Sequence, residues 1–157
     1  MIHRTARWSL TGAGASSASI AVLHVVIALV GPTPYIHFGA ADRAPAARVG
    51  SPVPALITLG LTIVFGLWAW YAFGAADVLR KPPLLMLGVW LIGVIYTLRG
   101  LMHFPGLLLM GEGGATPPRF AVFSFVSLAT GIAYLFGAWQ LRGQGSADGV
   151  PSDSACC

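Results

Sequence analysis

The sequence predicts an all-α polytopic membrane protein, with four transmembrane helices in an up-down bundle and a short interfacial helix in the first loop. Composition is the first reason: 56% of the 157 residues are hydrophobic and only 9% are charged, whereas a soluble domain has about 25% charged residues. The second is the presence of four apolar runs near the length of about 20 residues that a bilayer crossing requires. Because a spanning segment must satisfy its backbone internally and no alternation typical of barrel strands is present, each run is predicted to be helical.

The four spans are predicted at residues 10–31, 53–73, 84–104 and 120–141, inside one membrane domain of residues 1–142. The first run follows two arginines, as a signal peptide would, but "GPTPYIHF" comes after it instead of the small residues of a cleavage site. We therefore expect an uncleaved first helix. The tail, 143–157, is polar and glycine-rich, and we expect it to be disordered.

The first loop contains the predicted interfacial helix. Pro32 and Pro34 are expected to end or kink the first span, because proline lacks a backbone N–H and clashes with the preceding turn. Asp42 is a candidate N-cap for a short helix over residues 42–49, and Gly50 is its candidate stop. The arginines of this helix suit a segment that lies on the membrane surface.

A repeated pentapeptide, "FGAAD", occurs at residues 38–42 and 73–77. The flanking sequences do not match at the same offset, which argues against a duplicated unit. Aromatic residues favour the membrane interface and glycine favours helix ends. We interpret the pentapeptide as a helix-ending signal.

Polar side chains gather toward one end of the predicted bundle and define a candidate ligand-binding site. In the third span, one aromatic and two basic residues follow the spacing i, i+3 and i+7 and share a helix face. The spans contain no carboxylate, so an acid partner for the arginine must come from a loop. The candidate residues are His24, Asp42, Tyr96, Arg99, His103 and Glu112. The alternative is that Arg99 extends to the headgroups as an interface anchor.

Other chemistries are weakly supported or excluded by the sequence. His24 in a membrane helix is more often a hydrogen-bonding residue between helices than a ligand. No short His spacing predicts a metal site, and no phosphate loop, nucleophile elbow or C-x-x-C motif is present. Cys156 and Cys157 lie on the tail, and no cofactor and no nucleic acid partner is indicated. An enzymatic site of His and Arg side chains stays open only as a second alternative.

The fourth span carries small residues on two faces. Ala129, Ala133 and Gly137 form one stripe, and Ser127 with Gly131 begins another. Small residues allow a second helix to approach closely in a membrane. We therefore predict that Ser127, Gly131, Ala133 and Gly137 contact a protein partner or a second copy of the chain.

Three stretches, "YIHFGAADRAPAARVGSPVPALITLGL", "YAFGAADVLRKPPLL" and "IYTLRGL", resemble uncharacterised small bacterial four-helix membrane proteins of the broadly DoxX-like class. Some members of that class are implicated as subunits of redox complexes, and the resemblance implies no catalytic residues. It favours a bacterial inner membrane. Five Lys and Arg residues on the side of the termini against three on the other favour cytoplasmic termini. The predicted function is an accessory or structural membrane-complex subunit. The alternative is a small-molecule or lipid-binding or transport component that uses a polar pocket around Arg99.

Overall fold

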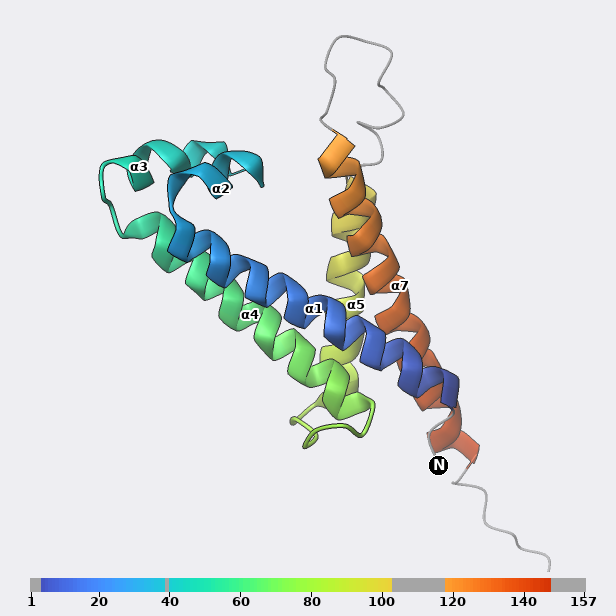
Figure 1. The fold of residues 1–157 in the computed structure, drawn as a ribbon. Helices are drawn as coiled ribbons and strands as arrows, with labels where there is room; N and C mark the ends of the chain where they lie inside the picture. Colours follow the sequence, from blue (N-terminus) through green and yellow to red (C-terminus); the bar gives the residue numbers. More distant parts are fainter. Residues whose placement is uncertain (1–3, 39, 103–117, 148–157) are drawn as a thin grey trace, which may run out of the picture. The chain divides into compact units, whose positions relative to one another are not determined.

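The structure is a computed structural model that describes residues 4–38, 40–102 and 118–147, and every regular element in these ranges is a helix (Figure 1). The predicted all-α class is therefore confirmed for them. The elements are α1 (Arg4–Val30), α2 (Pro32–His37), the 3-10 helix η1 (Ala41–Arg43), α3 (Ala44–Arg48), α4 (Val53–Ala75), α5 (Leu85–Met102) and α7 (Pro118–Ala147).

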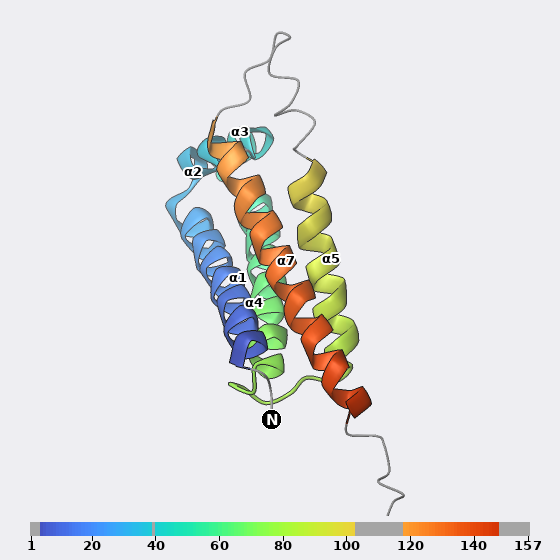
Figure 2. The same cartoon turned by 90° about the vertical axis from the view of Figure 1, so that its right-hand side faces the viewer.

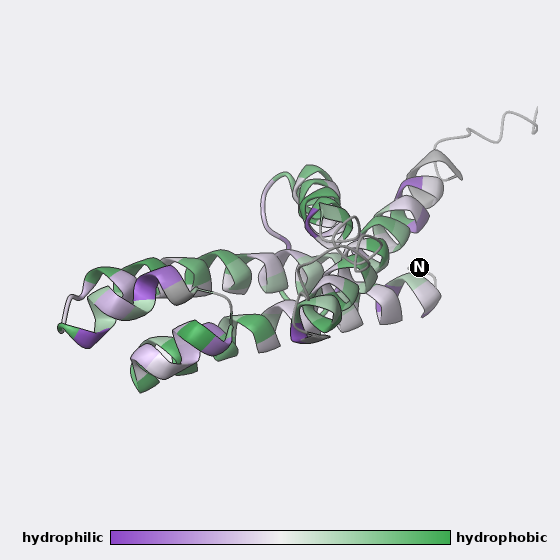
Figure 3. Cartoon of the chain, turned by 90° about the horizontal axis from the view of Figure 1, so that it is seen from above, coloured by the Kyte–Doolittle hydropathy of each residue, from purple (hydrophilic) through white to green (hydrophobic). Residues whose placement is uncertain are grey.

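Four of these helices are long and apolar enough to cross a membrane: α1, α4, α5 and the Arg119–Gly143 part of α7. Each coincides with one predicted span, although α1 begins earlier than expected and α7 continues to Ala147, into the predicted tail. Most positions along these helices carry the colours of hydrophobic or intermediate residues, and strongly hydrophilic residues occupy only a few places (Figure 3). Many large apolar side chains are exposed on these helices, as expected for a chain whose solvent is lipid.

The helices divide into two compact units. The first comprises Met1–Ala13 and Tyr71–Cys157, and the second comprises Gly14–Trp70. Helices α1 and α4 each contribute residues to both units. Each unit is described by itself below.

The first unit is built on the pair α5 and α7, which lie side by side and antiparallel (Figures 1 and 2). Glycines make the close contact possible. A Cβ atom at Gly131 of α7 would lie 2.6 Å from the backbone nitrogen of Thr97, and one at Gly100 of α5 would lie 2.8 Å from that of Leu128. Next to the Gly131 contact, the rings of Tyr96 and Tyr134 stack at 5.9 Å, and both side chains are buried.

The first turns of α1 complete this unit against α7. The hydroxyl of Thr5 donates to Oε1 of Gln140 at 2.8 Å, and Ser9 donates to the carbonyl of Ala133 at the same distance. Leu10 is fully buried, and it packs against Gly137. The amino-terminal end of α1 is thus fixed along α7 by polar and apolar contacts.

The second unit pairs residues 14–30 of α1 with residues 53–70 of α4, which run antiparallel and side by side (Figure 1). His24 and Phe65 are in ring contact between them at 5.0 Å. At the end where α1 stops and α4 starts, residues 32–38 and 40–51 form a small cap. We call this segment, α2 with η1 and α3, the first-loop cap.

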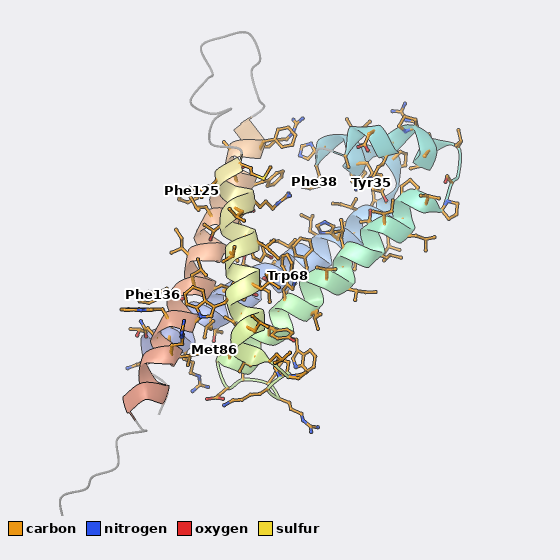
Figure 4. All side chains as sticks on the ribbon, turned by 180° about the vertical axis from the view of Figure 1, so that it is seen from behind. Tyr35, Phe38, Trp68, Met86, Phe125 and Phe136 are labelled. Carbon is orange, nitrogen blue, oxygen red and sulfur yellow. The ribbon has the colours of Figure 1, made fainter. Side chains whose placement is uncertain are left out.

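The first-loop cap has its own apolar core. Ile27 of α1, Tyr35 of α2 and Ala44 of α3 are buried together, with Leu23 and Ala47 packed against them. Figure 4 shows Tyr35 on α2 and Phe38 directly after this helix. The cap is therefore folded onto the end of α1 rather than extended away from it.

The cap corrects two details of the sequence prediction. Pro32 and Pro34 end α1 as predicted, but Pro32 then occupies the first turn of a new helix, α2, because its fixed φ suits that position. Asp42 does not cap the predicted 42–49 helix, since α3 begins after Arg43 and has no side-chain cap. Asp42 instead belongs to the 3-10 turn. Gly50 ends α3 as predicted: its φ is +79°, and Ser51 N–H donates to the carbonyl of Ala46.

The pentapeptide at 73–77 ends α4, in agreement with its interpretation as a helix-ending signal. Val78 N–H donates to the carbonyl of Phe73, and Asp77 N–H donates to that of Gly74, which is the Schellman pattern. Asp77 adopts the left-handed conformation with φ of 55°, and its carboxylate pairs with Lys81 at 2.9 Å. A tight basic turn is thereby fixed after the second candidate span.

Candidate functional site

The predicted shared face of Tyr96 and Arg99 is divided in the structure. Tyr96 is 1% exposed and faces α7, where it stacks on Tyr134. Arg99 lies in the last turn of α5 and is exposed. A separation of three residues rotates a side chain by about 60° from alignment around an α-helix. Because of this rotation, Tyr96 points into the contact between α5 and α7, whereas Arg99 stays exposed.

His24 lies in the second unit and is held by two contacts. Its Nδ1 is 2.8 Å from the carbonyl oxygen of Ile20, one turn earlier in α1, and its ring packs on Phe65. Because a carbonyl only accepts, this hydrogen bond requires a proton on Nδ1. Phe65 continues the contact to Trp68, with ring centroids 5.2 Å apart. His24 therefore serves the packing of α1 on α4.

Asp42 is exposed and lies at the edge of the first-loop cap. Its carboxylate is 4.0 Å from Nε of Arg43, and 78% of its side chain is exposed. His103 and Glu112 lie outside the described residues. His24 and Asp42 belong to the second unit, whereas Arg99 belongs to the first. The ligand-binding pocket and the acid partner of Arg99 therefore stay predictions.

Hydroxyl groups near the predicted polar end bond to their own helices. Thr58 donates to the carbonyl of Pro54 at 2.8 Å, Thr62 to that of Thr58, and Ser124 to that of Phe120. A hydroxyl bonded to the carbonyl four residues earlier is already satisfied within its helix. In addition, Thr58 lies 3.3 Å from the hydroxyl of Tyr35, which joins the cap to α4. The hydrogen bonds of these hydroxyls are therefore made within the helices, and Thr58 also contacts the cap.

The small residues predicted as a partner surface on α7 are used within the chain. Gly131 meets α5, and Gly137 meets the start of α1. Ser127 is buried, and the carbonyl of Ala133 accepts the hydrogen bond from Ser9. Their predicted role in contacting a partner stays untested, but each already contributes to the first unit.

Two buried nitrogens were not identified from the sequence. Nε1 of Trp90 and Nε of Arg119 have no hydrogen-bond partner among the described residues. The guanidinium of Arg119 lies 5.2 Å from the ring centroid of Phe120, at the start of α7. In the part of the chain that the structure describes, no three His, Cys, Asp or Glu side chains are grouped as they would be around a metal ion.

Together the fold and these residues define a class, a helical protein with four candidate membrane spans. No family model matches the chain, and no curated protein and no solved structure is significantly similar to it.

Proposed function

We propose that this protein is an integral protein of the bacterial inner membrane that serves as an accessory or structural subunit of a membrane complex. The observation that carries the proposal is one exposed face of α7, which we call its outer face and which contains Val122, Phe125, Ala129, Ile132 and Trp139. The side chains on this face are large and apolar, and 70% of Phe125 and 65% of Trp139 are exposed. Figure 4 shows Phe125 and Phe136 on the outer side of this helix. Val122 and Ile132 are also exposed and continue the face.

The face has a shape suited to a partner helix. Ala129 is exposed midway between Phe125 and Ile132, at helical spacings of four and three residues. A small residue between large ones leaves a recess into which the side chain of a neighbouring membrane helix fits, and close packing drives association where lipid gives no hydrophobic gain. The other small faces of α7 are occupied by α5 and α1, so this recess is the surface that we assign to the partner.

The polar groups support the same proposal. The hydroxyls of Thr58, Thr97 and Ser124 are bonded to carbonyls of their own helices. This arrangement suits a packing subunit better than a transport pathway, in which such groups would turn toward a substrate. The resemblance to DoxX-like four-helix proteins, some of which are implicated in redox complexes, points in the same direction.

The test is purification of the tagged protein from native membranes in mild detergent, with the complex measured by native mass spectrometry. We expect a stoichiometric complex with another membrane protein. Ala129→Phe should fill the recess and abolish the complex, whereas Leu56→Phe, on the exposed side of α4, should retain it. A wild-type protein that elutes alone, or a complex that survives Ala129→Phe, would refute the proposed subunit role.

For the orientation we propose an up-down arrangement with both termini in the cytoplasm and the first-loop cap on the outer surface. We predict that a membrane-impermeant thiol reagent added to intact cells modifies Val49→Cys, a position that is 83% exposed, in a background of Cys156→Ser and Cys157→Ser. In the parent chain, Cys156 and Cys157 should react only after the cells are permeabilised. Labelling of the native cysteines in intact cells, with a protected residue 49, would reverse the orientation.

A further inference from the structure

We infer that the first-loop cap binds the phosphate group of an anionic phospholipid, with Arg48 as the principal ligand and Arg43 beside it. The inference rests on the proposed membrane placement of the chain, but not on the proposed partner protein. Four properties of the cap support it, namely its depth, its charge, its exposed apolar residues and its rigidity.

The depth of the cap follows from the helices that flank it. Its chain leaves α1 at Val30 and enters α4 at Val53, which are ends of two candidate membrane spans. The hydroxyl contact between Tyr35 and Thr58, which lies in the second turn of α4, holds α2 against that end. Since spans end where the hydrocarbon meets the headgroups, a cap held at their ends lies among the lipid headgroups.

The charge of the cap is unbalanced. Asp42 is the only acidic residue of the second unit, and its carboxylate lies beside Arg43. Arg48 is exposed at the end of α3 and forms no ion pair with any described residue. A guanidinium at a membrane surface is well suited to a phosphate, which it binds with two parallel N–H donors. A lipid phosphate would supply the counter-charge that the unit lacks.

The cap also exposes apolar residues, one of them directly beside Arg48. Val49 follows Arg48 directly and is 83% exposed, and Ile36 on α2 is 43% exposed. In water such side chains would be unfavourable, whereas at a bilayer surface they enter the boundary between headgroups and acyl chains. A basic residue beside an apolar one matches the two parts of a phospholipid.

The cap is also rigid enough to present the arginines in a fixed position. Tyr35 and Ala44 are almost fully buried against Ile27. The end of α3 is fixed by the hydrogen bonds of Gly50 and Ser51 to the carbonyls of Ala47 and Ala46. A site that is ordered before the lipid arrives loses less entropy when the lipid binds.

The inference is tested with the purified full-length chain in detergent. Dioctanoyl phosphatidylglycerol is titrated and counted by native mass spectrometry, with dioctanoyl phosphatidylcholine as the neutral reference. We expect phosphatidylglycerol to bind preferentially. Arg48→Gln should weaken this binding about fivefold, which corresponds to about 1 kcal/mol for one basic residue at a membrane surface. Arg48→Lys should recover only part of it, because an ammonium keeps the charge but cannot form the two parallel hydrogen bonds of a guanidinium, and Asp42→Asn should strengthen it.

Two controls make the result decisive. Arg142→Gln removes an exposed arginine outside the cap, near the end of α7, and should leave the titration unchanged; an equal loss in this variant would show general charge attraction and overturn the inference. A large excess of inorganic phosphate should not displace the lipid, and displacement would show a site for free phosphate instead. Unchanged binding in Arg48→Gln, with helix content and melting temperature as in the parent, would also overturn it. Because partner capture is measured separately, lipid binding and the subunit role can fail independently.

Discussion

Gly131→Ala is expected to separate α5 from α7 and to destabilise the first unit. The new Cβ would lie 2.5 Å from Oγ1 of Thr97, 2.6 Å from its backbone nitrogen and 3.0 Å from the carbonyl oxygen of Gly93. A side chain can rotate away, but the backbone atoms of α5 cannot move without moving the helix. Overpacking of this kind costs about 1–3 kcal/mol. The melting temperature in detergent should fall by roughly 2–4 °C for each kcal/mol.

The matched control for this substitution is Gly66→Ala. Gly66 lies within α4, and a Cβ there would have no atom within 4 Å. The melting temperature should therefore not fall, and the higher helix propensity of alanine should raise it slightly. In Gly100→Ala, the new Cβ on α5 would lie 2.8 Å from the backbone nitrogen of Leu128 on α7. This variant should show the same fall in melting temperature as Gly131→Ala. The double substitution of Gly100 and Gly131 should cost less than the sum of the two, because one separation of the helices relieves both contacts. A Gly131→Ala protein as stable as Gly66→Ala would contradict the close α5–α7 contact.

The sequence predicted the four candidate spans well because their signal is local. A run of about 20 apolar residues is visible without any knowledge of its neighbours. Helix ends were predicted for the same reason: Gly50 and the pentapeptide at 73–77 carry their conformational preference within a few residues. The unpredicted helix α2 differs, because Pro32 both ends one helix and begins the next. Proline alone does not distinguish the two.

The sequence did not predict which helix packs against each small residue of α7. The spacing of small residues on α7 indicated that another helix approaches closely, but it carried no information on which helix. In the structure Gly131 contacts α5 and Gly137 contacts the start of α1, both in the same chain. The face assigned above to a partner contains Ala129. In the sequence, Ala129 and Gly131 are each separated from another small residue of α7 by four positions. Only the three-dimensional contacts separate these two roles.

For the polar residues of the candidate site, too, the sequence did not predict which side chains face a neighbouring helix. The spacing of Tyr96 and Arg99 placed them on one side of α5, but it could not say which of them turns toward α7. The structure buries Tyr96 against Tyr134 and exposes Arg99. For His24, composition could not distinguish a ligand from a packing residue. Its bond to the carbonyl of Ile20 and its contact with Phe65 support packing.

Tyr35 should control the order of the whole first-loop cap. Its side chain is 2% exposed and lies in the small core with Ile27 and Ala44. Tyr35→Ala removes the largest member of this core, and loss of a buried aromatic ring costs about 3–5 kcal/mol. A cap of so few residues has little other buried apolar area to offset this loss. We expect it to unfold locally while the candidate spans stay folded.

Tyr35→Phe separates the contribution of the ring from that of the hydroxyl. Thr58 keeps its hydrogen bond to the carbonyl of Pro54 at 2.8 Å when the tyrosine hydroxyl is removed, so no buried donor loses its only acceptor. The cost should then be about 0.5–1.5 kcal/mol, that of one hydrogen bond. Amide hydrogen exchange in detergent measures both variants through the protected N–H groups of Arg43, Val49, Gly50 and Ser51. Exchange at these four amides should become nearly as fast as in an unfolded chain in Tyr35→Ala, and it should rise by roughly two- to tenfold in Tyr35→Phe, since 1.4 kcal/mol corresponds to about tenfold. Equal exchange in the parent and in Tyr35→Ala would mean that the cap is held by its connections to α1 and α4 alone, and not by the packing of its own core.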